Sequence, residues 1–241
     1  MNNAATLEKQ RRYNELIKKY EISIKTFQKT EVEVLAECRA HPETAACKLF
    51  NLAEGELDAA SCHLVINGIS VAVLGMKSEE ALNDARKALS KAIIYVENVV
   101  TNMVNTLFSD YEEALKELSE ISAEKKLYFI RKTGLTIDLT KLAYGETSRW
   151  KWAFIDIEGR FAAIAKNLLD LRKAQSNESK NPDYIPVSQH TKLVKQLLDK
   201  AATNYIERYE LSTQNADDIM TAVNFISVLE RIKILLNDNE S

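Results

Sequence analysis

The stretch from Ser61 to Ser78, SCHLVINGISVAVLGMKS, is the most apolar part of the chain, and its conformation decides the fold. An Asn67-Gly68 pair lies in its middle, and Asn-Gly between apolar residues is a strong signal for a β-hairpin turn. The residues on either side do not alternate between apolar and polar, as a half-buried strand requires. A stripe with spacings of three and four runs through the pair from Ala53 to Leu74. Because that spacing keeps the stripe on one helix face, we predict a helix, with the hairpin as the alternative.

The same spacing recurs along most of the chain and predicts an all-α protein. The 241 residues include only 6 Gly and 3 Pro, about a third of average usage, whereas turn-rich β folds need both residues at many corners. The low glycine and proline content therefore predicts long helices with few connections. We expect an elongated antiparallel helical bundle of five or six long helices with coiled-coil-like heptad packing.

Breaks in the stripe divide the chain into five regions. Residues 1–130 are predicted to form long helical hairpins, with a corner at Pro42 and a helix N-cap at Ser78. From Ser78 to about Ile121 the spacing predicts one continuous helix. The other predicted regions are a bend with a short helix at 131–148, a long helix at 149–175 that begins its core stripe at Trp150, a linker loop at 176–188 and a C-terminal helical pair at 189–241.

The helical interpretation explains the small residues of the apolar stretch. Ser61, Gly68 and Gly75 lie seven residues apart. Gly68 and Ala72 have a small-xxx-small spacing, which lets another backbone approach closely. For Asn67 two interpretations stay open: a buried polar residue that fixes the helix register, and one that faces solvent. The candidate close-packing residues are Leu64, Gly68, Val71, Ala72 and Gly75.

The same residues carry a second interpretation, as a membrane-active segment. Residues 64–76 are too few for a spanning helix but long enough for a concealed insertion segment. In architecture alone, this resembles the apolar element that elongated helical pore-forming toxins hide in their soluble form. We regard a membrane as the less favoured partner.

Charge and the N-terminal sequence argue for a soluble protein. With 32 basic and 35 acidic side chains, the formal net charge of -3 gives no global field to attract phosphate backbones, so no nucleic-acid partner is expected. The N-terminal residues lack the apolar core of a signal peptide, and no run of about 20 apolar residues is evident. We expect a cytoplasmic protein, or an exported one if a leader has been removed.

The cysteines offer a disulfide more readily than a metal site. Cys38 and Cys47 are nearly symmetric about the Pro42 corner and would face each other across an antiparallel hairpin. We favour the alternative, in which both are small buried apolar side chains. A zinc ion would need a fourth ligand near Cys38, His41 and Cys47, and none is close in sequence, so no metal is predicted. Because no catalytic or phosphate-binding motif occurs, we also predict no catalytic residue and no cofactor.

Candidate partner contacts come from apolar residues away from the core stripes. Trp152 lies about 160° around the helix from the stripe that contains Trp150, where it could be exposed beside Lys151 and contact a partner. We favour the alternative, in which it packs against a neighbouring helix of the bundle. Tyr184 and Ile185, apolar residues in the polar linker, are a second candidate contact.

Together these features predict a non-enzymatic structural or scaffold protein that binds protein partners, or copies of itself, through long helical surfaces. Two alternatives remain: a membrane-active helical protein that uses residues 64–76, and a ligand-sensing helical bundle with polar core groups such as Asn67 and Asn102.

Overall fold

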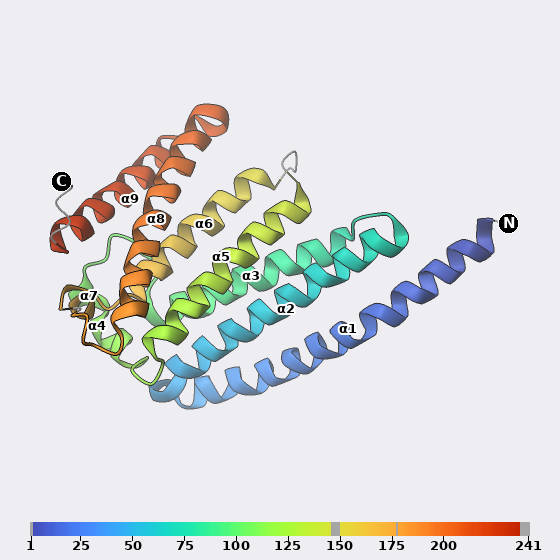
Figure 1. The fold of residues 1–241 in the computed structure, drawn as a ribbon, viewed down its shortest axis with the longest axis horizontal. Helices are drawn as coiled ribbons and strands as arrows, with labels where there is room; N and C mark the ends of the chain where they lie inside the picture. The colour runs from blue at the N-terminus through green and yellow to red at the C-terminus, as the bar shows by residue number, and fades with distance from the viewer. Residues whose placement is uncertain (1, 146–149, 177, 237–241) are drawn as a thin grey trace. The chain divides into compact units, whose positions relative to one another are not determined.

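The structure, a computed structural model, confirms the all-α prediction. It describes residues 2–145, 150–176 and 178–236, with side chains from residue 6 onward. Every regular element of these residues is helical (Figure 1). In chain order the elements are α1 (Asn2–Ala40), the 3₁₀ turn η1 (Pro42–Thr44), α2 (Ala45–Leu74), α3 (Glu79–Val100), α4 (Phe108–Lys116), α5 (Ala123–Tyr144), α6 (Lys151–Asn167), α7 (Leu171–Gln175), α8 (Tyr184–Arg208), the π-helical turn η2 (Tyr209–Thr213) and α9 (Ala216–Leu235).

The described residues form two compact units. Unit 1 comprises those within Met1–Tyr95 and Leu135–Ser148, and unit 2 those within Val96–Gly134 and Arg149–Ser241. The division falls inside α3 and inside α5. Each unit therefore has its own helices and its own core.

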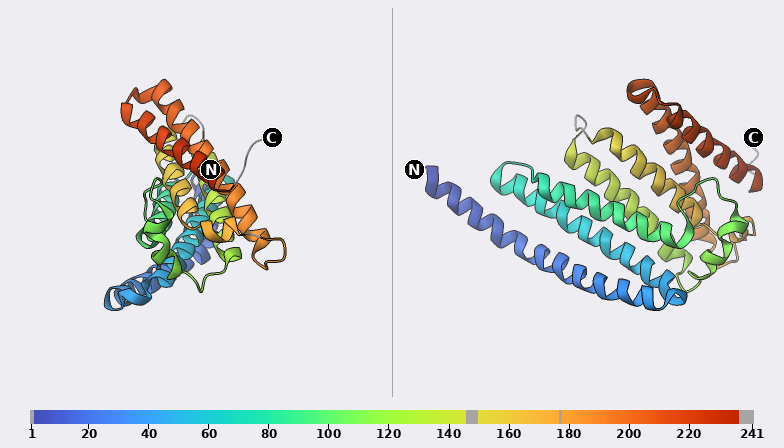
Figure 2. Two further views of the ribbon diagram at one scale, coloured as in Figure 1. Left: turned by 90° about the vertical axis from the view of Figure 1, so that its left-hand side faces the viewer. Right: turned by 180° about the vertical axis from the view of Figure 1, so that it is seen from behind.

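In unit 1, α1 and α2 form the hairpin expected at Pro42, and the unit 1 part of α3 runs alongside α2 (Figure 2). Ile17 and Ile24 of α1 pack with Ile66 of α2 and Ala81 of α3. Farther along the helices, small residues replace the isoleucines, and Phe27 packs on Ala59, Ala60 and Ala88.

The apolar stretch is helical, so the hairpin alternative is wrong. α2 continues through Asn67 and Gly68 and ends at Gly75, whose φ of 76° is the left-handed conformation that closes many helices. Asn67 is buried, and its Oδ1 accepts a hydrogen bond from the backbone N–H of Ser78 at 2.9 Å. Ser78 Oγ in turn accepts from Ala81 N at 3.3 Å, which confirms the predicted N-cap of α3. The Asn67 side chain therefore fixes the turn between α2 and α3.

In unit 2, α6 provides the central stripe of the core. From Phe154 to Leu171 the predicted stripe residues are buried. Trp150 is the exception, because it lies at the N-cap of α6 and stays partly exposed. α8 packs on both α6 and α9, so the predicted C-terminal helical pair is present.

The predicted bend at 131–148 is wrong for residues 131–144, which belong to the single helix α5. The apolar rhythm is weak there because Thr133, Thr136 and Thr140 occupy buried positions. Thr133 Oγ1 donates to the carbonyl of Phe129 at 2.8 Å, and Thr140 Oγ1 to that of Thr136 at 2.6 Å. Hydrogen bonding within the helix lets threonine fill core positions that usually hold apolar residues. Residues 146–148 lie outside the described residues.

The predicted continuous helix from Ser78 to Ile121 is also wrong, because α3 ends at Val100 and α4 begins at Phe108. Thr101 has a φ of 95°, which a helix does not allow. The loop after it is fixed by α6: Asn167 Nδ2 donates to the carbonyl of Thr101 at 3.0 Å, and Lys166 Nζ to that of Thr106 at 2.7 Å.

Two further boundaries differ from the prediction. The helix expected at 149–175 is divided, since α6 ends at Asn167 and Asp170 caps the short α7 by accepting from Arg172 N and Lys173 N. The linker expected at 176–188 ends earlier, because α8 begins at Tyr184. Tyr184 and Ile185 are therefore in the first turn of a helix.

Candidate functional site

The candidate site is an exposed face near the C-terminal end of α2, within unit 1. We call it the uncharged face. Three large side chains on it are substantially open to solvent: Val65 at 40%, Val71 at 47% and Met76 at 63% exposure. Smaller exposed residues separate them. The face consists of Val65, Gly68, Val71, Ala72, Gly75 and Met76.

The part of α2 that carries this face has no charged side chain. Between Asp58 and Lys77 the sequence contains no acidic residue, lysine or arginine. His63 is the only titratable imidazole there, and burial lowers its pKa, so it is neutral at pH 7. Soluble proteins normally place charged side chains on exposed helix faces, and contiguous apolar patches mark interaction sites.

Four of the five predicted close-packing residues are exposed to solvent. Leu64 is partly buried, but Gly68, Val71, Ala72 and Gly75 are exposed. A Cβ added at Gly68 would meet no atom within 4 Å. The small-xxx-small pair of Gly68 and Ala72 therefore leaves an open seam.

Close packing at glycine occurs at two other positions, which the sequence did not single out. A Cβ at Gly55 would overlap the ring of Phe27, whose Cζ atom lies 2.7 Å away. A Cβ at Gly159 would lie 2.6 Å from the hydroxyl oxygen of Tyr205. Both glycines lie within helices, and their sequence neighbours do not indicate close packing. Only the aromatic ring that packs against each glycine reveals its role.

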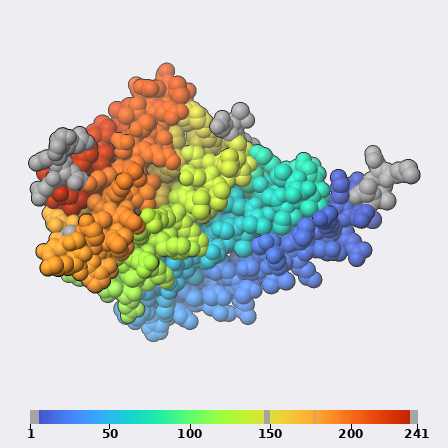
Figure 3. All heavy atoms as spheres, in the orientation of Figure 1, coloured from blue at the N-terminus to red at the C-terminus, as the bar shows by residue number. Residues whose placement is uncertain are grey.

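A second exposed apolar stripe lies on α5. Figure 3 shows this helix at the surface of the molecule. Leu135, Leu139 and Leu142 are all exposed there. Asp138 and Lys141 lie between them in sequence. Because charged residues accompany this stripe, it resembles an ordinary solvated helix face more closely than the uncharged face does.

The other predicted contact residues have mixed surroundings. Trp152 is partly buried, and the Lys151 ammonium lies 4.6 Å from the centre of its ring. Ile185 is exposed, and Tyr184 is exposed to a smaller extent. Whether these residues contact a partner stays a prediction.

No disulfide joins Cys38 and Cys47, both of which the structure describes. Cys38 is buried in α1 and Cys47 is partly buried in α2. The alternative interpretation, small side chains in the hairpin interface, fits this arrangement. Among the described residues, no group of three or more His, Cys, Asp or Glu side chains is arranged to hold a metal ion.

Sequence reasoning missed a buried polar cluster in unit 1. Lys91 of α3 lies between two buried carboxylates, with its Nζ 2.5 Å from Glu31 of α1 and 2.8 Å from Glu56 of α2. Tyr95 donates a short hydrogen bond to Glu31. The one signal in the sequence is that Glu31 interrupts the apolar stripe of the first helix.

Burial and the neighbouring Glu31 raise the pKa of Glu56 to about 7. Burial also acts on Glu31, but hydrogen bonds from Glu56, Lys91 and Tyr95 outweigh it and lower its pKa. Below about pH 7 the cluster therefore contains a protonated acid, a carboxylate, an ammonium and a phenol, each with a partner. These side chains connect α1, α2 and α3 within unit 1.

By length and composition, one helical segment of the described residues could cross a membrane. It runs from Pro42 to Leu74 and has a window of mean hydropathy 1.6. The sequence-based expectation that no such segment exists was therefore too strict. The core helix of a soluble protein can satisfy the same criterion, and the buried Glu56 belongs to this helix.

Comparison with known families matches residues 9–241, which include all of α2 to α9 and most of α1. The chain belongs to the TP0443 family. This membership extends over both units and over the uncharged face. No curated protein and no solved structure matches the chain.

Proposed function

We propose that the chain is a non-enzymatic structural protein that self-associates by packing the uncharged face of α2 against the same face of a second copy. The observation that carries this proposal is the absence of charge on an exposed helix face from Ala59 to Met76. An apolar face of this kind loses contact with water when another apolar surface covers it.

Its residue spacing favours a helix as the occupant. Val65, Gly68, Ala72 and Gly75 follow one another at intervals of three, four and three residues, the spacing of a coiled-coil seam. Gly68, Ala72 and Gly75 have little or no side chain. A second helix can therefore approach the α2 backbone closely.

The face is also suited to pairing with itself. In a two-fold symmetric pair, the same patch is used by both copies. In an antiparallel arrangement with the axis near Gly68, this glycine would face its symmetry mate, and Val65 would lie near Val71 of the other copy. Since no side chain on the face is charged, such a pair brings no like charges together.

The test is the mass of the protein in solution, measured by light scattering after size exclusion over a range of concentrations. We expect a dimer or a larger even-numbered oligomer for the wild type. Val71→Lys should shift the equilibrium to the monomer, because a lysine on the uncharged face would be desolvated against apolar groups of the second copy. Val32→Lys is the matched control, since Val32 is 68% exposed on α1 and lies outside the uncharged face.

Three outcomes would contradict the proposal: a wild type that stays monomeric at the highest soluble concentration, equal effects of the two lysine variants, or an oligomer that Val71→Lys leaves intact. Co-sedimentation with phosphatidylcholine and phosphatidylglycerol vesicles distinguishes the membrane alternative. If the protein is a monomer and binds the vesicles, and Val71→Lys abolishes that binding, a membrane-binding function would replace the proposed self-association.

A further inference from the structure

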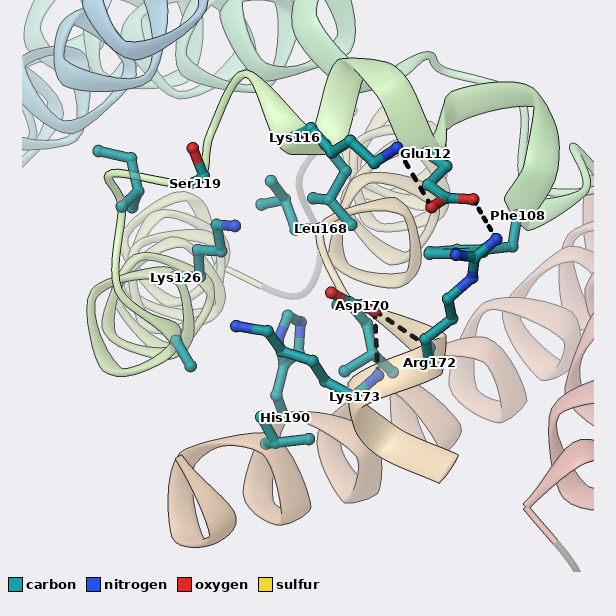
Figure 4. Close-up of a pocket in the computed structure, with 15 residues that line it drawn as sticks. Phe108, Glu112, Lys116, Ser119, Lys126, Leu168, Asp170, Arg172, Lys173 and His190 are labelled. Carbon is teal, nitrogen blue, oxygen red and sulfur yellow. Dashed lines mark hydrogen bonds and ion pairs between the residues drawn. The ribbon is translucent and has the colours of Figure 1, made fainter. Parts of the chain in front are cut away.

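Unit 2 contains a pocket of about 270 Å³ that the proposed self-association does not use (Figure 4). Its walls come from α4 and the turn after it, the start of α5, the segment from Leu168 to Lys173, and α8. This volume is just below the usual range of ligand sites, about 300–1,000 Å³, and suits a small molecule.

The inner wall of the pocket is apolar. The large apolar side chains that line it are Leu115, Ile121, Leu168, Leu169 and Val187, and each is at most 8% exposed in the folded chain. Because these side chains also belong to the core of unit 2, the wall does not have to form when a ligand arrives. It favours a ligand whose surface is mostly apolar.

The charged side chains at the rim pair with one another or with neighbours. Glu112 lies between two cations, with its Oε2 2.7 Å from Arg172 Nη2 and its Oε1 3.5 Å from Lys116 Nζ. Lys173 Nζ lies 3.5 Å from Oδ2 of Asp183. These three cations therefore need no counter-charge from a ligand.

His190 of α8 brings a polar group to the apolar wall. The side chain is buried, and its ring points toward the pocket (Figure 4). Its Nε2 lies 2.9 Å from the carbonyl oxygen of Ala165. Since a carbonyl oxygen can only accept, Nε2 carries the proton and Nδ1 has a lone pair that can accept a hydrogen bond. Among the described residues, the ring has this carbonyl as its hydrogen-bond partner, and Nδ1 has none.

The imidazole of His190 is neutral at pH 7. Burial and the Lys126 ammonium lower its pKa to about 4, although the hydrogen bond to Ala165 acts in the opposite direction. Nδ1 is therefore an acceptor over the whole neutral range. A buried acceptor without a partner costs free energy, and a donor on a ligand would recover it.

We propose that this pocket binds a small neutral alcohol or phenol, whose apolar body lies against Leu115, Leu168 and Val187 and whose O–H donates to Nδ1 of His190. Alcohols and phenols share the donor that this nitrogen recognises. A molecule of similar shape without a donor, such as an ether, would use the same wall but leave Nδ1 unpaired.

Isothermal titration of the full chain with 4-propylphenol, 1-octanol and the methyl ether of each tests the proposal. We expect at least one of the two hydroxyl compounds to bind about three- to tenfold more tightly than its own ether, which is the usual contribution of one hydrogen bond. The relative affinity of 4-propylphenol and 1-octanol distinguishes an aromatic from an aliphatic ligand.

His190→Leu should remove this preference, so that the hydroxyl compound and its ether bind within about twofold of each other. His63→Leu is the matched control, since it makes the same change at a partly buried histidine of α2 outside the pocket lining. It should leave the ratio of the two affinities unchanged.

If His190→Leu loses its helical circular dichroism, ¹⁵N NMR of the imidazole nitrogens in the wild type replaces it, because the chain contains only three histidines. The hydroxyl compound should shift the resonance of the unprotonated Nδ1 of His190, and its ether should not.

Absence of binding by both hydroxyl compounds would overturn the proposal. Ethers that bind as tightly as the hydroxyl compounds would do so as well, as would a preference that persists in His190→Leu or an Nδ1 resonance that neither compound moves. These results do not depend on the mass of the protein in solution. Failure of the ligand proposal and failure of the proposed self-association can therefore be told apart.

Discussion

The hydroxyl oxygen of Tyr205 lies 2.6 Å from the point where a Cβ atom at Gly159 would stand. This close approach joins α6 to α8 in the core of unit 2. The tyrosine is held from several sides. Its ring stacks on Phe225 with 5.8 Å between centres, its hydroxyl donates to Asp156 at 3.2 Å, and the Arg208 guanidinium lies 4.9 Å from the ring centre.

Because the ring of Tyr205 cannot move away without breaking these contacts, Gly159→Ala should destabilise the protein. We expect the free energy of unfolding to fall by about 1–3 kcal/mol, the usual effect of an extra methyl group in a packed core. Urea denaturation followed by circular dichroism measures the change.

Gly134→Ala is the matched control, since it makes the same change within α5, where the nearest atom to the added Cβ would be Phe161 Cε1 at 3.5 Å, an ordinary van der Waals contact. Alanine favours a helix over glycine by about 1 kcal/mol, so this variant should be neutral or slightly more stable. Similar losses of stability in both variants would contradict the role assigned to Tyr205.

Asp218 and Asp156 both pair with Arg208, but their surroundings differ. The side chain of Asp218 is 5% exposed and that of Asp156 is 58% exposed. Arg208 Nη1 lies 2.9 Å from Oδ1 of Asp156, and Asp218 also accepts a hydrogen bond from the Thr213 hydroxyl in η2. The hydrogen bond from Arg208 is the main reason that the pKa of Asp218 lies below its ordinary value.

We therefore expect Asp218→Asn to cost about 2–4 kcal/mol of stability at pH 7, because a partly buried guanidinium loses its charged partner. Asp156→Asn should cost less than about 1 kcal/mol. The contribution of Asp218 should be fully present above the ordinary pKa of an aspartate and should be lost as the pH falls through its lowered pKa in the fold, because protons then bind the unfolded chain first. Equal costs for the two variants at pH 7 would refute this assignment.

The apolar stripes predicted the all-α fold and much of its core because helix periodicity depends on local sequence. Phe154 and Phe161, on the core stripe predicted to begin at Trp150, are buried, and the predicted helix through Asn67 and Gly68 is present. The same rule failed in α5, where buried threonines resemble a surface pattern until their hydroxyl groups are seen to bond within the helix.

The candidate sites were less accessible to sequence reasoning because each depends on contacts between distant residues. The apolar stretch of α2 was found from its composition, but only the structure reveals which of its faces is open. The pocket was missed altogether. Lys126 and Lys173 lie on elements far apart in sequence, and nothing in either element marks them as neighbours.

Asn67 was left with two interpretations, and its burial turns one of them into a prediction. Its Oδ1 accepts the backbone N–H of Ser78, so Asn67→Ala leaves that donor without its partner. We expect a loss of about 1–2 kcal/mol in the free energy of unfolding. Asn98→Ala, at an exposed position of α3, should change it by less than about 0.5 kcal/mol. Indistinguishable unfolding curves for the two variants would show that Asn67 does not hold the turn.

The carboxyl pair of Glu31 and Glu56 in unit 1 should make the stability of the fold depend on pH. The pKa of Glu56 is raised to about 7 in the fold, against an ordinary value near 4.3 in an unfolded chain. Between these two values the folded state binds more protons than the unfolded state. The contribution of the Glu56 carboxyl to the stability of the fold is therefore fully present below about pH 4.3 and is lost as the pH rises through about 7.

Glu56→Gln replaces the protonated acid by a neutral amide of the same shape, which can still donate to Glu31. Since the amide does not titrate, the variant should lack the fall in stability that Glu56 causes in the wild type between about pH 4.3 and 7. The free energy of unfolding of the variant minus that of the wild type should therefore be about 1–3 kcal/mol higher at pH 8 than at pH 5. Glu54→Gln, on the same helix outside the cluster, is the matched control. Urea titrations at pH 5, 6, 7 and 8 measure both differences, and a Glu56→Gln difference that stays constant would show that this carboxyl titrates normally in the fold.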